Sequence, residues 1–157
     1  SNWDPILLIC ALGREANLQI MGKNQLFKIP ILRTFLRKMG VFPVDRGHSD
    51  ISAVKRSIQA LKDGFMLMVF PEGTRVRKKN RGVRPKGGVA MMAIRAGAKL
   101  MPIYIGTKKR LFARVPIIFG KPFTPEYTGR KGTVEEYQAN ADEVIRRAYE
   151  LGGETWT

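Results

Sequence analysis

Cysteine, histidine and acidic residues are all scarce in this sequence, and each shortage excludes some structures or functions. The 157 residues include one cysteine and one histidine. The lone cysteine, Cys10, excludes an internal disulfide and is consistent with a reducing compartment. Its neighbours Ile9 and Ala11 are apolar, which favours a buried and unreactive thiol.

Long apolar runs are also missing. No run reaches the roughly 18 residues that cross a bilayer, and Ser1 does not begin a signal-peptide pattern. We therefore expect that this segment does not cross a membrane by itself. The hydrophobic fraction of 44% and the aromatic fraction of 9% exclude a disordered or collagen-like chain. A chain of 157 residues predicts a single domain, 1–157, with one core.

The shortage of acidic residues leaves a strongly basic chain. Only 13 Asp and Glu oppose 28 Lys and Arg, which gives a formal charge of +15 and a pI near 10.5. This excess predicts an anionic partner. Several partners would fit this prediction: nucleic acid, an anionic membrane surface, a phosphorylated substrate or an acidic carrier protein. Charge alone does not distinguish them, so the motifs are needed.

Short apolar strands alternate with helical segments along the chain. This order predicts an α/β fold with a mainly parallel central sheet and helices on both faces, in which functional loops follow the carboxyl ends of the strands. The strands are expected at residues 18–21, 41–44, 65–70, 100–105 and 115–119. The helices are expected at residues 5–12, 25–39 with a break or kink at Pro30, 51–61, 88–96 and 133–151.

The most specific motif is Phe-Pro-Glu-Gly-Thr-Arg at residues 70–75, directly after an apolar strand. Its glycine, Gly73, permits close approach of the backbone to a ligand. Arg75 can hold a phosphate through two hydrogen bonds, and Glu72 can orient Arg75 or accept a hydrogen bond from a substrate hydroxyl. From chemistry alone, a structural turn with a surface ion pair explains the motif equally well.

A second motif, Val-Asp-Arg-Gly at residues 44–47, also follows a short apolar strand. If the two strands are neighbours, Arg46 and Arg75 converge on one anion, and two guanidinium groups neutralise a phosphate dianion without a metal. The alternative is a solvated ion pair between Asp45 and Arg46, which is the commoner role of such a pair.

In order along the chain, these motifs resemble those of the 1-acylglycerol-3-phosphate acyltransferase family. The resemblance covers almost the whole chain, and its third motif, residues 70–75, is the specific one. The others are similar to the family's motifs at Asp4-Pro5, Met21-Gly22-Lys23 with Gln25-Leu26, Val44-Asp45-Arg46 and Met101-Pro102-Ile103.

The resemblance implies an acyltransferase fold and an enzyme of phospholipid synthesis. Such an enzyme moves a fatty acyl group from an acyl carrier protein or coenzyme A thioester to lysophosphatidic acid, giving phosphatidic acid, with no metal or other cofactor. It would act at the cytoplasmic face of a membrane with an anionic surface, peripherally or through an N-terminal anchor. The implied substrate-binding residues are Lys23, Arg46, Glu72, Gly73, Thr74 and Arg75. Glycerol 3-phosphate or another lysophospholipid is an alternative acceptor.

The family's catalytic histidine stands five residues before its motif aspartate, which corresponds to Asp4. That position would fall two residues before Ser1. We therefore expect the sequence to be truncated there, and the 157-residue chain to be inactive. Asp4 would orient the absent histidine and could also cap its helix. The one histidine present, His48, lies in a polar loop where a structural or solvated role is typical.

A basic run occupies residues 75–86, with seven Lys and Arg and no acidic residue. Such a run is usually a solvated loop. It could also attract an anionic membrane at about 1 kcal/mol per residue, or an acidic carrier protein. A non-catalytic module that binds nucleic acid or membrane is the alternative from another class, but no aromatic residue interleaves the run to stack on bases, so nucleic acid is not expected.

Overall fold

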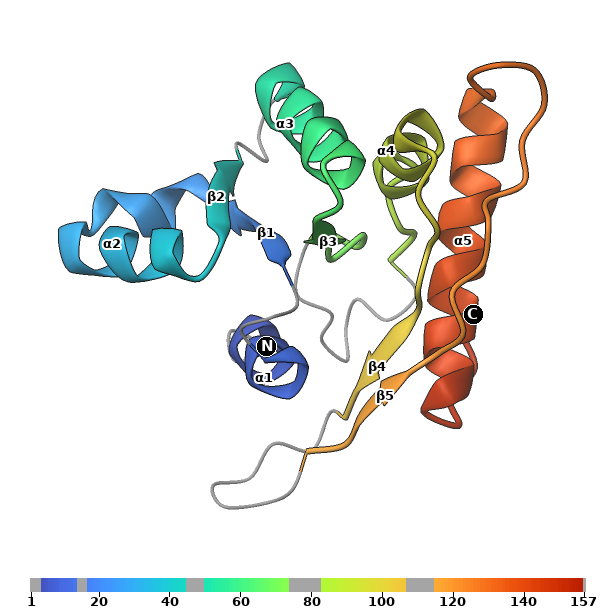
Figure 1. Cartoon of the computed structure of the whole chain (residues 1–157). Coiled ribbons are helices and arrows are strands. Elements are labelled where there is room, and N and C mark those ends of the chain that lie inside the picture. The colour runs from blue at the N-terminus through green and yellow to red at the C-terminus, as the bar shows by residue number, and fades with distance from the viewer. Residues whose placement is uncertain (1–3, 14–16, 45–49, 74–82, 107–114, 157) are drawn as a thin grey trace. The chain divides into compact units, whose positions relative to one another are not determined.

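The computed structural model describes residues 4–13, 17–44, 50–73, 83–106 and 115–156. The chain forms two compact units, Asn2–Phe70 and Pro71–Thr157, which are described separately (Figure 1). The single-domain organisation of residues 1–157 stays a prediction.

The first unit contains a three-stranded parallel sheet. Its strands are β1 (Leu18–Lys23), β2 (Val41–Val44) and β3 (Met66–Met68), in the order β2-β1-β3. Ile20 of the central strand pairs with Val41 on one side and with Met68 on the other. The parallel α/β organisation is confirmed, although β3 is shorter than the expected strand 65–70.

Four helical segments connect or precede these strands. They are α1 (Asp4–Leu12), the 3₁₀ helix η2 (Asn24–Lys28), α2 (Pro30–Lys38) and α3 (Ile51–Lys62). The expected break at Pro30 is confirmed, because Ile29 is extended and Pro30 begins α2, where its missing N–H is not needed. Asp50 caps α3 by accepting a hydrogen bond from the Ala53 N–H at 2.9 Å.

Helices cover both faces of the sheet, as predicted. On one face, a Cβ atom at Gly22 would lie 3.3 Å from the Phe27 ring of η2, so the glycine lets this ring approach the strand. On the other face, the Arg56 guanidinium of α3 lies 4.7 Å from the centre of the Phe42 ring. Figure 1 shows α1 and α3 on opposite sides of the three strands.

Gly40 begins the turn into β2 under two constraints. Its φ angle of 73° is in the left-handed region, which a side chain disfavours. A Cβ atom at this position would also collide with the backbone oxygen of Leu18 in β1. The Gly40 oxygen accepts a hydrogen bond from the Ile20 N–H at 2.9 Å, so the turn is tied directly to the central strand.

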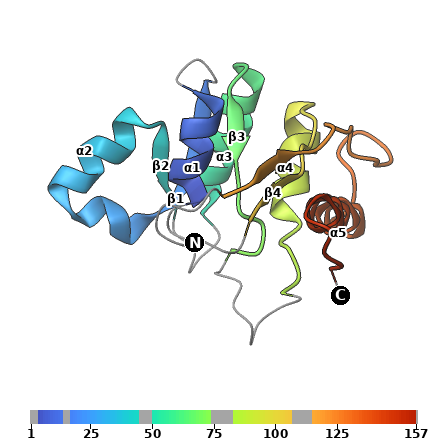
Figure 2. The same cartoon turned by 90° about the horizontal axis from the view of Figure 1, so that it is seen from below.

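The second unit packs α4 (Gly88–Ala96) against α5 (Val134–Leu151), beside β4 (Ile103–Ile105) and β5 (Ile117–Phe119) (Figure 2). Its core is small and mostly aliphatic: Ala90, Ala93, Ile94, Leu100, Tyr137 and Val144. The expected capping box of α5 is confirmed, since the Thr133 hydroxyl accepts from the Glu136 N–H and the Glu136 carboxylate accepts from the Thr133 N–H.

The strands of the second unit depart from the expected parallel arrangement. Strands β4 and β5 are antiparallel, with Ile103 opposite Phe119. Both are shorter than expected. Leu100 pairs with Phe123 only through an isolated bridge, and Pro102, which lacks an N–H, lies between that bridge and β4.

Candidate active site

The three parallel strands end at one edge of their sheet. In the order β2-β1-β3, the chain passes from β1 to β2 on one side of it, and then crosses over to form β3 on the other side of β1. Ligand crevices of open parallel sheets form at such a reversal, beyond the carboxyl ends of the strands. The residues after β1 and β3 therefore flank the position where the fold favours a ligand.

The predicted convergence of Arg46 and Arg75 assumed that their strands are neighbours, and this assumption is wrong. Strand β1 separates β2 from β3. Two strand spacings, about 9–10 Å, therefore lie between them. The central strand between them ends at Lys23, another of the predicted substrate-binding residues.

The described residues include part of the predicted site. Asp4 is the first residue of α1 and Lys23 is the last residue of β1. Glu72 and Gly73 lie in the turn after β3. Four residues considered in the sequence, Arg46, His48, Thr74 and Arg75, lie outside the described residues.

The turn that holds Glu72 and Gly73 is tied to a distant segment. The Lys86 N–H donates a hydrogen bond to the Pro71 oxygen at 2.9 Å. Gly73 has a φ angle of 65°, and a Cβ atom there would lie 3.4 Å from Cε of Lys86. Lys86 thus lies beside the motif glycine. The sequence placed Lys86 only in the basic run and did not indicate this contact.

Glu72 is half-buried in this turn, and burial raises the pKa of its carboxyl above the ordinary value of 4.5. Among the described residues, no cationic side chain forms a salt bridge with it. Both roles expected of this carboxyl, orienting Arg75 and accepting a hydrogen bond from a substrate hydroxyl, stay predictions.

We expect Glu72→Gln to increase the free energy of unfolding relative to the unsubstituted chain at pH 7. The native state holds the Glu72 proton more tightly than the unfolded state, so ionising this carboxyl opposes folding as the pH rises above 4.5. Urea denaturation at pH 4 and pH 7 should show the advantage of the variant growing with pH. An advantage that is larger at pH 4 would contradict this account.

The carboxyl end of the basic run is anchored to α5. Arg84 forms a bidentate ion pair with Asp142, with its shorter contact at 2.7 Å. Gln138 donates to the Pro85 oxygen at 2.8 Å and also to Asp142. Arg84, one of the seven basic residues of the run, therefore has an anionic partner in its own unit.

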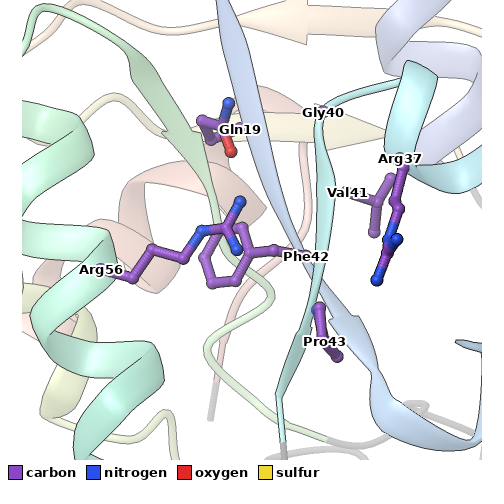
Figure 3. Close-up of a pocket in the computed structure, with 7 residues that line it drawn as sticks. All are labelled: Gln19, Arg37, Gly40, Val41, Phe42, Pro43 and Arg56. Carbon is purple, nitrogen blue, oxygen red and sulfur yellow. The ribbon is translucent and has the colours of Figure 1, made fainter.

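A hollow of about 360 Å³ lies along β2, within the first unit (Figure 3). Arg37 of α2 and Arg56 of α3 lie on opposite sides of this strand. The hollow is lined by Gln19, Arg37, Gly40, Val41, Phe42, Pro43 and Arg56. It runs along the strand from its amino end and includes none of the predicted site residues, so it is distinct from the candidate site.

Comparison with known proteins supports the motif series. The acyltransferase family model matches residues 1–106. A 1-acyl-sn-glycerol-3-phosphate acyltransferase of Streptococcus pneumoniae is 35% identical over 126 residues, covering 76% of this chain and 46% of that protein. One from Bacillus subtilis is 29% identical over 156 residues, covering 96% of this chain and 77% of that protein.

A solved structure also matches. The crystal structure of the 1-acyl-sn-glycerophosphate (LPA) acyltransferase PlsC from Thermotoga maritima has a TM-score of 0.67 and 25% identity. The match covers 97% of this chain and 63% of that chain. Together with the α/β fold and the ordered motifs, these matches establish that the chain belongs to the acyltransferase family.

The chain spans only part of these relatives: about half of the Streptococcus protein. Within the part of the chain that the structure describes, no helix combines the length and apolar character needed to span a bilayer.

Proposed function

We propose that the protein transfers a fatty acyl group from a thioester to the free hydroxyl of lysophosphatidic acid, giving phosphatidic acid. The observation that carries this proposal is the complete Phe-Pro-Glu-Gly-Thr-Arg motif at residues 70–75 after a parallel strand. It is supported by the family match and by relatives named as 1-acyl-sn-glycerol-3-phosphate acyltransferases.

The proposed chemistry is an acyl transfer assisted by a general base. In the mechanism that the family resemblance implies, the histidine that would precede Asp4 by five residues takes the proton of the substrate hydroxyl, and Asp4 holds its imidazole in orientation. The hydroxyl oxygen attacks the thioester carbonyl, so that a C–O bond forms and the C–S bond breaks. The departing thiolate then takes the proton from the imidazolium.

The remaining predicted residues would hold the substrate. Lys23, Arg46 and Arg75 provide three positive charges for the phosphate, which suits a dianion. Glu72, Gly73 and Thr74 would shape the glycerol pocket, since the turn carries a half-buried carboxyl and a glycine that leaves room. The Glu72 carboxyl accepts a hydrogen bond from the second glycerol hydroxyl or orients Arg75.

The acyl donor is either an acyl carrier protein or a coenzyme A thioester. Both are anionic, so both suit a chain with a formal charge of +15. We place the reaction at the cytoplasmic face of a membrane, where a lipid acceptor and an anionic surface are both present.

Arg75→Ala is expected to weaken binding of lysophosphatidic acid far more than binding of a neutral monoacylglycerol. Losing a charged hydrogen-bonding partner costs about 1.5–3 kcal/mol, which is roughly a 10- to 150-fold change in affinity. Arg75→Lys should recover only part of the loss, because an ammonium lacks the planar two-pronged geometry. Equilibrium binding of both lipids by the variants measures the difference.

Equal losses for both lipids would eliminate the phosphate role of Arg75. Arg46→Ala is the paired variant and should show the same selectivity.

The proposed activity itself is tested by incubating a chain that includes the upstream histidine with an acyl thioester and lysophosphatidic acid. Preference for glycerol 3-phosphate would change the acceptor, and tight nucleic-acid binding without acyl transfer would favour a non-catalytic module.

A further inference from the structure

Helix α2 exposes an apolar surface. None of its residues is buried. Ile31 is 86% exposed and Phe35 is 50% exposed, and Ile29, directly before the helix, is 53% exposed. Leu32 and Leu36 are half-buried on another side. The helix therefore has one apolar side toward its unit and a second apolar patch, Ile31 with Phe35, that the described residues leave largely exposed.

The sequence from η2 to β2, which includes α2, carries charge of one sign. Residues 24–44 contain four basic side chains and no acidic one. Ile31, Phe35 and Lys38 are spaced i, i+4 and i+7, so the exposed ammonium follows the apolar pair on one side of the helix. The other basic residues are Lys28, Arg33 and Arg37, all of them exposed.

We propose that α2 lies in the interface of an anionic lipid bilayer, with Ile31 and Phe35 inserted among the acyl chains and Lys38 at the phosphate level. Apolar insertion combined with basic flanks is the pattern of interfacial helices. An anionic bilayer matches both the apolar pair and the basic residues. An acidic protein would match the basic residues, but it would also need an apolar pocket for Ile31. The inference deepens the proposed function by specifying how a lipid-modifying enzyme reaches its acceptor.

Co-sedimentation with lipid vesicles tests the proposal without requiring turnover. The chain should bind vesicles containing phosphatidylglycerol and phosphatidylcholine more tightly than vesicles of phosphatidylcholine alone, and salt should weaken the anionic preference. The double variant Ile31→Ser/Phe35→Ser should bind the anionic vesicles at least about tenfold more weakly, because it loses two inserted apolar side chains. Its melting temperature should fall only slightly, since Ile31 is 86% exposed and half of the Phe35 surface is already in solvent.

Val134→Ser is the matched control. Val134 is 74% exposed but is followed by Glu135 and Glu136, so its side chain should not insert and its loss should leave vesicle binding unchanged. Unchanged binding of the double variant would overturn the proposal, as would wild-type protein that ignores anionic vesicles. If the double variant kept vesicle affinity but lost acyl carrier protein, the patch would be a protein-docking surface. Vesicle binding as expected, together with no acyl transfer by a chain extended to include the upstream histidine, would instead contradict the proposed function and leave the vesicle result standing.

Discussion

The 157-residue chain is expected to fold but to transfer acyl groups about 10²–10⁴-fold more slowly than a chain extended upstream to include the motif histidine. This range is the typical contribution of a positioned general base. The rate of phosphatidic acid formation, measured at equal protein concentration with the same thioester and lysophosphatidic acid, gives the ratio directly. Circular dichroism of both chains shows that the difference comes from chemistry.

Two substitutions separate the roles in this prediction. In the extended chain, replacing the upstream histidine by alanine should reduce the rate to that of the 157-residue chain. His48→Ala should change the rate little in either chain, because the family resemblance assigns no proton transfer to this position. Robust turnover by the 157-residue chain that disappears on His48→Ala would show that His48 is the base.

Gly40→Ala is expected to lower the free energy of unfolding by about 3 kcal/mol or more. The left-handed backbone alone costs a non-glycine residue about 1–2 kcal/mol, and the new Cβ atom would push against the Leu18 oxygen. That oxygen belongs to the backbone of the central strand, so it cannot move aside as a flexible side chain would. Urea denaturation of the variant and the unsubstituted chain measures the loss.

Gly64→Ala is the control for this effect. Gly64 also has a left-handed φ angle, 86°, but a Cβ atom there would meet no atom within 4 Å. Its substitution should therefore cost only the backbone penalty of about 1–2 kcal/mol. If both variants lose the same stability, the contact between Gly40 and β1 is not an important constraint.

The local features that the sequence predicted correctly are those governed by neighbours in the chain. Pro30 broke a helix because proline removes a backbone donor wherever it occurs. Thr133 and Glu136 formed the capping box because three residues are enough to define it. The parallel strands followed from the alternation of short apolar runs with helices.

The errors concern which segments meet across the fold. Nothing in the residues around Arg46 and Phe70 indicates that β1 inserts between their strands. Likewise, the pairing of β4 with β5 depends on the direction in which the chain returns after residue 106, and apolar content does not encode that direction. Arg84 and Asp142 are 58 residues apart, so their ion pair cannot be predicted without knowing how α5 packs.

The hydrogen bond from Lys86 to Pro71 and the ion pair of Arg84 with Asp142 hold the two ends of the intervening segment. The position of these ends therefore does not depend on how many residues lie between them. Loop closure entropy grows only with the logarithm of length, so doubling a flexible loop costs about 0.6 kcal/mol. The number of residues between Arg75 and Arg84 can therefore change at little cost in free energy, while the hydrogen bond from Lys86 keeps Pro71, and Glu72 next to it, in place.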